Sequence, residues 1–196
     1  GPHTASEGME GKSLASVFTG SNYYDSDLYS GGHNYGGTRL SNLRTNLSGG
    51  VTLEFWLKKP LWDLSNTKRE VIFDLWNGHE SSSVDYGRLT LELSGTATSG
   101  ESPFILTCMS GTSGFAEQHI GSSITTSSIT DWTHIAVSLQ NEAAVVRTMF
   151  YVNGELNQSK TLGSSLGDVT GSLNAYIGAL RTAPSGNVYE AVDATA

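Results

Sequence analysis

The sequence has almost no cysteine, and this limits how the fold is held together. Cys108 is the only cysteine among 196 residues. An intrachain disulfide is therefore excluded, and the fold must depend on its hydrophobic core or on a metal ion. The sequence also has no apolar run that approaches the roughly 20 residues needed to cross a bilayer, so we expect no membrane insertion.

Basic residues are scarce as well. The chain has 11 Lys and Arg against 19 Asp and Glu, which gives a formal net charge of -8 at pH 7. Binding to nucleic acid or to an anionic membrane surface depends on clustered Lys and Arg. We therefore expect neither as a partner, and neutral sugars, cations or basic proteins match this surface better.

Patterns typical of long helices are missing, and the composition is that of a β protein. Hydrophobic residues make up 37% of the chain and charged residues only 15%, and the balance is rich in Gly, Ser, Thr and Asn. Many short strands joined by turns need such a mixture. The length suits one domain, which we expect over residues 13–196. Residues 1–12, which are polar and begin with GPH, are interpreted as a tag or flexible lead-in.

Apolar residues recur with period two, which predicts strands with one buried face. In VTLEFWLKK, starting at Val51, alternation places Phe55 on the core side and Trp56 on the opposite side. The pair Asn153 and Gly154 predicts a type I′ hairpin, because both residues tolerate positive φ. The predicted strands are residues 14–19, 51–59, 69–76, 87–94, 103–110, 133–140, 147–153, 155–162 and 174–180.

Six of these segments occur in an order that resembles a known family. VTLEFWLKK, REVIFDLW, GRLTLELS, DWTHIAVSL, RTMFYVNGEL and AYIGAL follow one another as in the laminin G-like branch of the concanavalin A-like lectin/glucanase superfamily. The resemblance implies an all-β fold, a concanavalin A-like jelly-roll sandwich of two antiparallel sheets. It also implies a function within a range that runs from sugar binding through protein adhesion to polysaccharide cleavage.

The segment DWTHIAVSL invites a catalytic interpretation because it brings Asp131, Trp132 and His134 together. A general base needs an acid on the far side of its imidazole, and Asp131 belongs to the turn before the strand. We therefore interpret His134 as a hydrogen-bonded residue of the sheet. Trp132 is predicted to anchor the core or an edge of the sandwich.

A glycoside hydrolase or polysaccharide lyase is the less favoured alternative. A retaining glycosidase needs two carboxyl groups about 5 to 5.5 Å apart. Glu70 and Asp74 share a face of one predicted strand, but four residues of extended chain separate them by roughly 13 Å. We therefore expect no enzymatic activity and no catalytic residues.

Carboxylates in the Gly-rich segment NYYDSDLYSGGHNYGG suggest a metal site. Calcium takes six to eight oxygen ligands, and Asp25 and Asp27 could supply two of them. The alternative is that both are exposed turn-forming residues. Domains similar to this one commonly hold calcium at the rim of the sandwich, so the resemblance implies Ca²⁺ as a cofactor without assigning its ligands.

Aromatic residues in or near predicted loops are the candidates for sugar binding. A flat aromatic ring can stack on the apolar face of a pyranose. Tyr29 and Tyr35 lie among small polar residues, and Trp62 and Trp76 lie close to loops. For each of the four, the alternative is a role in the core or, for Trp62, as a plug at the edge of the sandwich.

These observations favour a non-catalytic recognition module that binds carbohydrate, with or without the help of calcium. The alternative is a structural or adhesive domain that contacts protein within a larger surface or virion assembly. Either function suits an extracellular or surface-exposed location, virion surfaces included. A glycan or a protein is therefore the expected ligand.

The C-terminal part departs from the resembled pattern. Similar domains close the sandwich with a final strand beside the first one, but here NVYEAV alternates only weakly and no further strand follows before Ala196. We expect Val188, Tyr189 and Val192 to cover part of the first strand's edge. A strand from another chain or from a larger assembly is the alternative cover.

Overall fold

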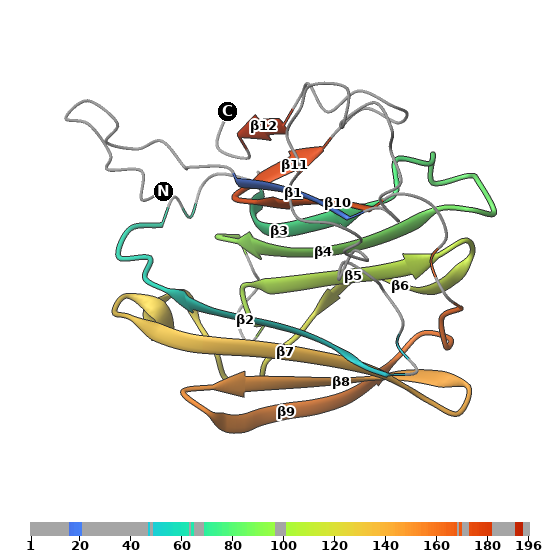
Figure 1. Cartoon of the computed structure of the whole chain (residues 1–196). Helices are drawn as coiled ribbons and strands as arrows, with labels where there is room; N and C mark the ends of the chain where they lie inside the picture. Colours follow the sequence, from blue (N-terminus) through green and yellow to red (C-terminus); the bar gives the residue numbers. More distant parts are fainter. Residues whose placement is uncertain are drawn as a thin grey trace, which may run out of the picture.

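The computed structural model describes residues 16–20, 47, 49–62, 64, 69–96, 101–167, 169, 173–181 and 191–193. Two antiparallel sheets face one another, as Figure 1 shows. The six-stranded sheet has the order β1 (Ser16–Gly20), β10 (Leu173–Ile177), β3 (Arg69–Trp76), β4 (Gly87–Ser94), β5 (Phe104–Ser110) and β6 (Ser113–His119). The four-stranded sheet has the order β2 (Val51–Leu57), β7 (Thr133–Glu142), β8 (Val145–Val152) and β9 (Glu155–Leu162). This arrangement confirms the predicted class of fold.

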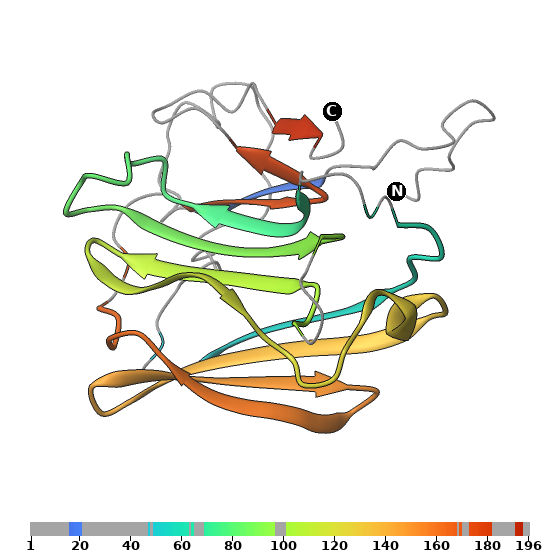
Figure 2. The same cartoon turned by 180° about the vertical axis from the view of Figure 1, so that it is seen from behind.

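The core lies between the two sheets and follows from the period-two pattern. On β4 the core leucines are Leu89, Leu91 and Leu93, and on β7 the alternate positions from Ile135 to Leu139 are buried in the same way. Their other faces carry more polar residues, so each strand presents one side to the core. The view from behind in Figure 2 shows the same two layers.

Aromatic and sulfur-containing side chains complete this core. The rings of Phe104 on β5 and Phe150 on β8 meet at 5.1 Å between their centroids, which joins the two sheets. Cys108 is buried in the same core cluster. Burial raises the pKa of its thiol to about 12, so this cysteine is an inert packing residue.

The predicted hairpin between β8 and β9 is confirmed. Asn153 has φ 52° and Gly154 has φ 82°, the positive values that a type I′ turn requires. Val152 pairs with Glu155 directly across the turn. This short connection fixes the register of the last two strands of the four-stranded sheet.

Three features were not predicted from the sequence. The strand β6 and the 3-10 helix η1 (Thr126–Ile129) were both missed. The predicted strand over 174–180 is divided at Gly178, which has φ 73°, into β10 and β11 (Ala179–Arg181). Within the described part of the chain, no helix has the length and apolarity needed to cross a membrane.

The C-terminal strand does not cover the edge that we expected it to cover. β12 (Ala191–Asp193) pairs with β11, with Leu180 opposite Val192, and forms a separate two-stranded sheet. β1 lies at the edge of the six-stranded sheet, and β10 is its partner among the described strands. The expectation for Val192 is therefore wrong, whereas Val188 and Tyr189 lie outside the described residues.

Candidate functional site

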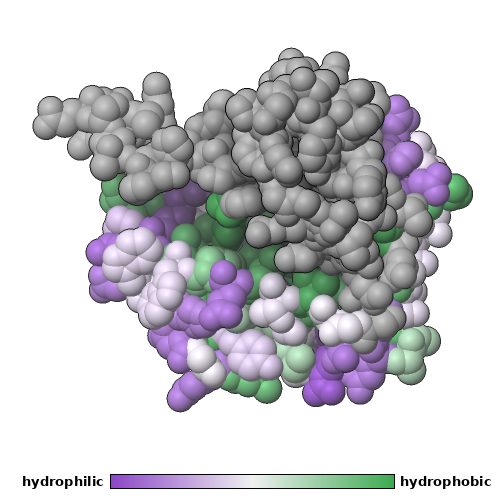
Figure 3. All heavy atoms as spheres, viewed as in Figure 1, coloured by the Kyte–Doolittle hydropathy of each residue, from purple (hydrophilic) through white to green (hydrophobic). Residues whose placement is uncertain are grey.

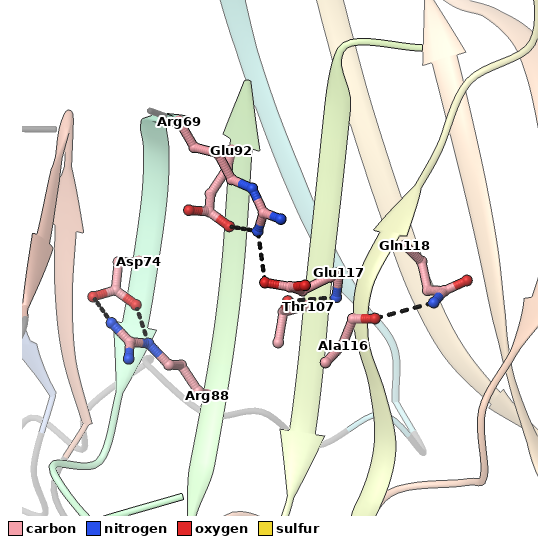
Figure 4. Close-up of polar contacts among 8 residues, drawn as sticks. All are labelled: Arg69, Asp74, Arg88, Glu92, Thr107, Ala116, Glu117 and Gln118. Carbon is pink, nitrogen blue, oxygen red and sulfur yellow. Dashed lines mark hydrogen bonds and ion pairs between the residues drawn. The ribbon is translucent and has the colours of Figure 1, made fainter. Parts of the chain in front are cut away.

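A row of polar side chains crosses the outer face of the six-stranded sheet. Because β4 buries its leucines in the core, its alternate residues Arg88, Thr90 and Glu92 face outward. The register sets Asp74 of β3 opposite Thr90. We define the polar face as Thr90 together with six residues that Figure 4 labels, namely Arg69, Asp74, Arg88, Glu92, Thr107 and Glu117.

One end of the polar face is a buried ion pair. Asp74 is fully buried, and its two carboxylate oxygens accept hydrogen bonds from Arg88 Nε at 2.8 Å and Nη2 at 3.0 Å. Burial alone would lower the pKa of Arg88, but the hydrogen bonds and the charge of Asp74 outweigh that effect and raise it. The Arg88 guanidinium also lies 4.6 Å from the centroid of the Trp76 ring. Both side chains are therefore fixed in place.

The other end of the polar face opens to solvent. Arg69 Nη1 donates to Glu117 Oε1 at 2.8 Å and lies 3.4 Å from Glu92 Oε2, so one nitrogen serves two carboxylates. The Glu92 side chain is 13% exposed, whereas the Glu117 side chain is 65% exposed. Burial raises the pKa of Glu92, and the charge of Arg69 opposes that rise. A ligand approaching this face would meet Glu117 and Arg69 first.

A distortion of β6 aims Glu117 at Arg69. Glu117 has φ 54°, which is rare for a residue with a side chain, and the β5–β6 register shifts between Leu106 and Cys108. Its amide donates to Thr107 Oγ1 at 2.9 Å, in place of a regular ladder bond. A β-bulge of this kind bends the strand and redirects a side chain. Period-two analysis missed β6 for the same reason, because the bulge interrupts its alternation.

Glu70 and Asp74, the two carboxylates considered for catalysis, are bound to different partners. Glu70 forms an ion pair with Lys59 at 2.7 Å, whereas Asp74 is held by Arg88. Each carboxylate therefore has its own cation, and Asp74 has no contact with solvent. This arrangement agrees with the expectation that Glu70 and Asp74 do not act as a catalytic pair.

Two of the four predicted sugar-binding aromatic residues fall within the described part of the chain. Trp76 is only 3% exposed, and its Nε1 donates to the carbonyl of His79 at 2.9 Å. Trp76 thus offers no exposed ring, which corrects the expectation of a stacking residue near a loop. Trp62 packs against the core, and Lys59 Nζ lies 4.9 Å from its ring centroid. Tyr29 and Tyr35 lie outside the described residues.

The predicted calcium ligands are not tested by the structure. Asp25 and Asp27 both lie outside the described residues. Across the described ranges, no three His, Cys, Asp or Glu side chains converge in a way that could hold a metal ion. Calcium binding by Asp25 and Asp27 therefore stays a prediction.

The segment around His134 differs from the prediction at one position. His134 Nε2 lies 2.8 Å from Glu54 Oε1 on the neighbouring strand, as expected for a hydrogen-bonded residue of the sheet. Trp132, however, is 65% exposed and anchors neither the core nor an edge. The core position at this end of β7 is filled by Ile129 of η1, which is 1% exposed.

A hollow of about 360 Å³ lies where the two sheets meet beside β2. Its lining is mainly apolar and includes Phe55, Leu57 and Ile72, and Lys59 and Glu70 are the charged pair that borders it. Figure 3 shows apolar residues between hydrophilic ones in the middle of the view. Because this lining offers few hydrogen-bonding groups, it suits the hydroxyls of a sugar less well than the polar face does.

Comparison with known proteins agrees with this architecture. The model of the concanavalin A-like lectin/glucanases superfamily, of the laminin G type, matches residues 30–190. A search of curated proteins finds no match. The family match covers most of the chain, and its all-β sandwich is the fold observed. The chain therefore belongs to the concanavalin A-like lectin/glucanase superfamily, as a laminin G-like domain.

Proposed function

We propose that the chain is a non-catalytic recognition module that binds carbohydrate at the open end of the polar face. The observation that carries this proposal is the ion-pair cluster in which Arg69 bridges Glu92 and Glu117. It holds charged donors and acceptors in fixed positions at the boundary with solvent. A few well-placed polar groups of this kind give a binding site its specificity for hydroxyls.

The same cluster argues against hydrolysis. Glu92 and Glu117 are the two carboxylates of the polar face that share a partner. Their oxygens lie 3.4 and 2.8 Å from the same nitrogen of Arg69. A glycosidase needs its acid and its nucleophile or base on opposite sides of the scissile bond. Here the Arg69 guanidinium contacts both carboxylates through one nitrogen.

Calcium and the aromatic residues before β2 complete the proposal. Asp25 and Asp27 supply oxygen ligands of the type that calcium prefers, and Tyr29 and Tyr35 supply rings for stacking. Laminin G-like domains are typically extracellular and bind glycans or proteins. We propose an extracellular or surface-exposed location for this chain, and a virion surface is one such place.

A protein-contact function is the second candidate. β1 lies at the edge of the six-stranded sheet, and β10 is its partner among the described strands. An unpaired edge accepts an added strand from another chain by main-chain hydrogen bonding. On this alternative the domain is a structural or adhesive part of a larger assembly and has no sugar site.

A glycan array probed with and without a chelator separates the two functions. The proposal expects some glycans to retain the chain, and loss of signal in chelator would point to calcium. Glu117→Ala should weaken retention, whereas Glu155→Ala, which removes an exposed carboxylate of β9, should not. A folded chain that stays silent on the array in both conditions would favour the protein-contact function.

A further inference from the structure

The outer face of the four-stranded sheet carries a second group of side chains suited to a ligand. The register sets Trp56 of β2 opposite His134 of β7, and Ala136 of β7 between Glu54 and Tyr151. Partners in register share one face of a sheet, so these side chains lie together on the side away from the core. We call Glu54, Trp56, His134, Ala136, Ser138 and Tyr151 the aromatic face.

Trp56 is exposed and held by its neighbours. The residue is 64% exposed, as alternation predicts for the outward side of β2. The His134 ring lies 5.1 Å from the Trp56 ring, tilted by 54°, and covers one part of it. An aromatic ring that is exposed yet supported by a neighbouring ring is a stacking platform of low conformational freedom.

A fixed hydrogen-bond acceptor lies beside this platform. His134 Nε2 is 2.8 Å from Glu54 Oε1, and the Glu54 side chain is 64% exposed. The His134 side chain is only 18% exposed, so it acts from within the sheet to orient the carboxylate. Glu54 thus presents carboxylate oxygen to solvent next to an aromatic surface.

The side chains at the centre of the aromatic face project little from the sheet, because they are small. Ala136 and Ser138 lie on the strand between Trp56 and Tyr151. Trp56 and Tyr151 are two strands apart, which separates them by about 10 Å across the sheet. A ligand can therefore lie over the small residues and contact both rings.

The polarity of this face favours an uncharged ligand. Apart from Glu54 and its hydrogen-bonded partner His134, the aromatic face consists of apolar and hydroxyl-bearing side chains, namely Trp56, Ala136, Ser138 and Tyr151. The Glu54 carboxylate would repel an acidic ligand. Two rings and a hydrogen-bond acceptor complement an uncharged sugar, whose C–H face is apolar and whose edges carry hydroxyls.

We propose that the aromatic face is a binding site for neutral carbohydrate, in which Trp56 stacks on a sugar ring and Glu54 accepts hydrogen bonds from its hydroxyls. This inference rests on the proposed function, since it assumes that the chain binds carbohydrate. It adds a site on the opposite side of the sandwich from the polar face.

The chain offers a matched control for the test. Trp56 and Trp132 are 64% and 65% exposed, but only Trp56 lies beside the Glu54–His134 pair. Affinity electrophoresis in gels containing galactomannan, xyloglucan, laminarin or dextran should show retardation of the wild-type chain by at least one polysaccharide. Trp56→Ala should weaken that affinity about tenfold, the effect of losing a stacking contact worth about 1.4 kcal/mol. Trp56→Phe should retain part of it, and Trp132→Ala should behave as wild type.

The outcomes distinguish this site from the proposed function as a whole. A wild-type chain retarded by none of the four polysaccharides would count against both. Retardation that is equal for wild type, Trp56→Ala and Trp132→Ala would overturn the aromatic face alone. Equal losses in Trp56→Ala and Trp132→Ala would also overturn it, because the effect would then belong to exposed tryptophan in general.

Discussion

The two outer faces of the sandwich differ in which side chains they expose to water. On the polar face, charged groups bind one another, and the pair of Asp74 and Arg88 is largely withdrawn from water. On the aromatic face, an apolar ring is exposed to water, and the Glu54 carboxylate, which is hydrogen-bonded to His134, is also largely exposed. Breaking a pair on the first face should therefore affect folding, whereas the same change on the second should affect ligand contact and little else.

The comparison predicts its largest effect at Asp74. Asp74→Ala would leave the Arg88 guanidinium in a site where its side chain is only 17% exposed, without its bidentate partner. Loss of one member of a buried pair costs about 3 to 5 kcal/mol. Urea denaturation should therefore show a decrease of that size in the free energy of unfolding. A decrease under about 1 kcal/mol would show that the polar face is not held by this pair.

A smaller decrease is expected at Arg69. Arg69→Ala removes the cation shared by Glu92 and Glu117, but the Arg69 side chain is 32% exposed, so water compensates in part. We expect a loss of about 1 to 2 kcal/mol in the same assay. Glu117→Ala should cost less than Arg69→Ala, because the Glu117 carboxylate is mostly in water. The reverse order would mean that Glu117, not the bridging Arg69, organises this end of the face.

The pH dependence of stability sharpens the comparison further. Burial raises the pKa of Glu92 above its ordinary value of 4.5, so the folded chain binds this proton more tightly than the unfolded chain does. The stability that this group contributes is fully present below pH 4.5 and is lost as pH rises through the raised value. Melting temperatures of wild type and Glu92→Gln should therefore diverge across that window. Parallel curves would contradict the role assigned to burial.

The smallest effect is expected on the aromatic face. Glu54→Gln alters a carboxylate that is 64% exposed, and exposed ion pairs contribute little to stability. The free energy of unfolding should change by less than about 0.5 kcal/mol. A loss as large as that of Arg69→Ala would remove the distinction between the two faces.

Much of this fold could be predicted from alternation alone. The predicted strands 69–76, 87–94 and 155–162 have the observed boundaries, and in 87–94 apolar and polar residues alternate cleanly from Leu89 to Leu93. The strand β6 escaped prediction because its bulge at Glu117 breaks that alternation. Trp132 was assigned to the core or an edge by its size, but the neighbouring 3-10 helix fills the core with Ile129 instead.

The polar face could not be predicted in the same way. Arg69 is 48 residues from Glu117 and 23 from Glu92, and Arg88 is 14 from Asp74. Only the register of three strand pairings brings these charges together, and a single-residue slip would send them to the other face. The exposure of Trp56 could be predicted, because alternation places it on the side of the strand that faces away from that of Phe55.

Recognition without cleavage is the central claim, and one measurement tests it most directly. The glycan that the chain retains should be incubated with a large amount of wild-type protein and assayed for new reducing ends, with binding followed in the same samples. The account predicts binding and no new reducing ends at any pH where the chain is folded. New reducing ends that disappear in Glu92→Gln would contradict it, because they would show that Glu92 acts as an acid in spite of Arg69.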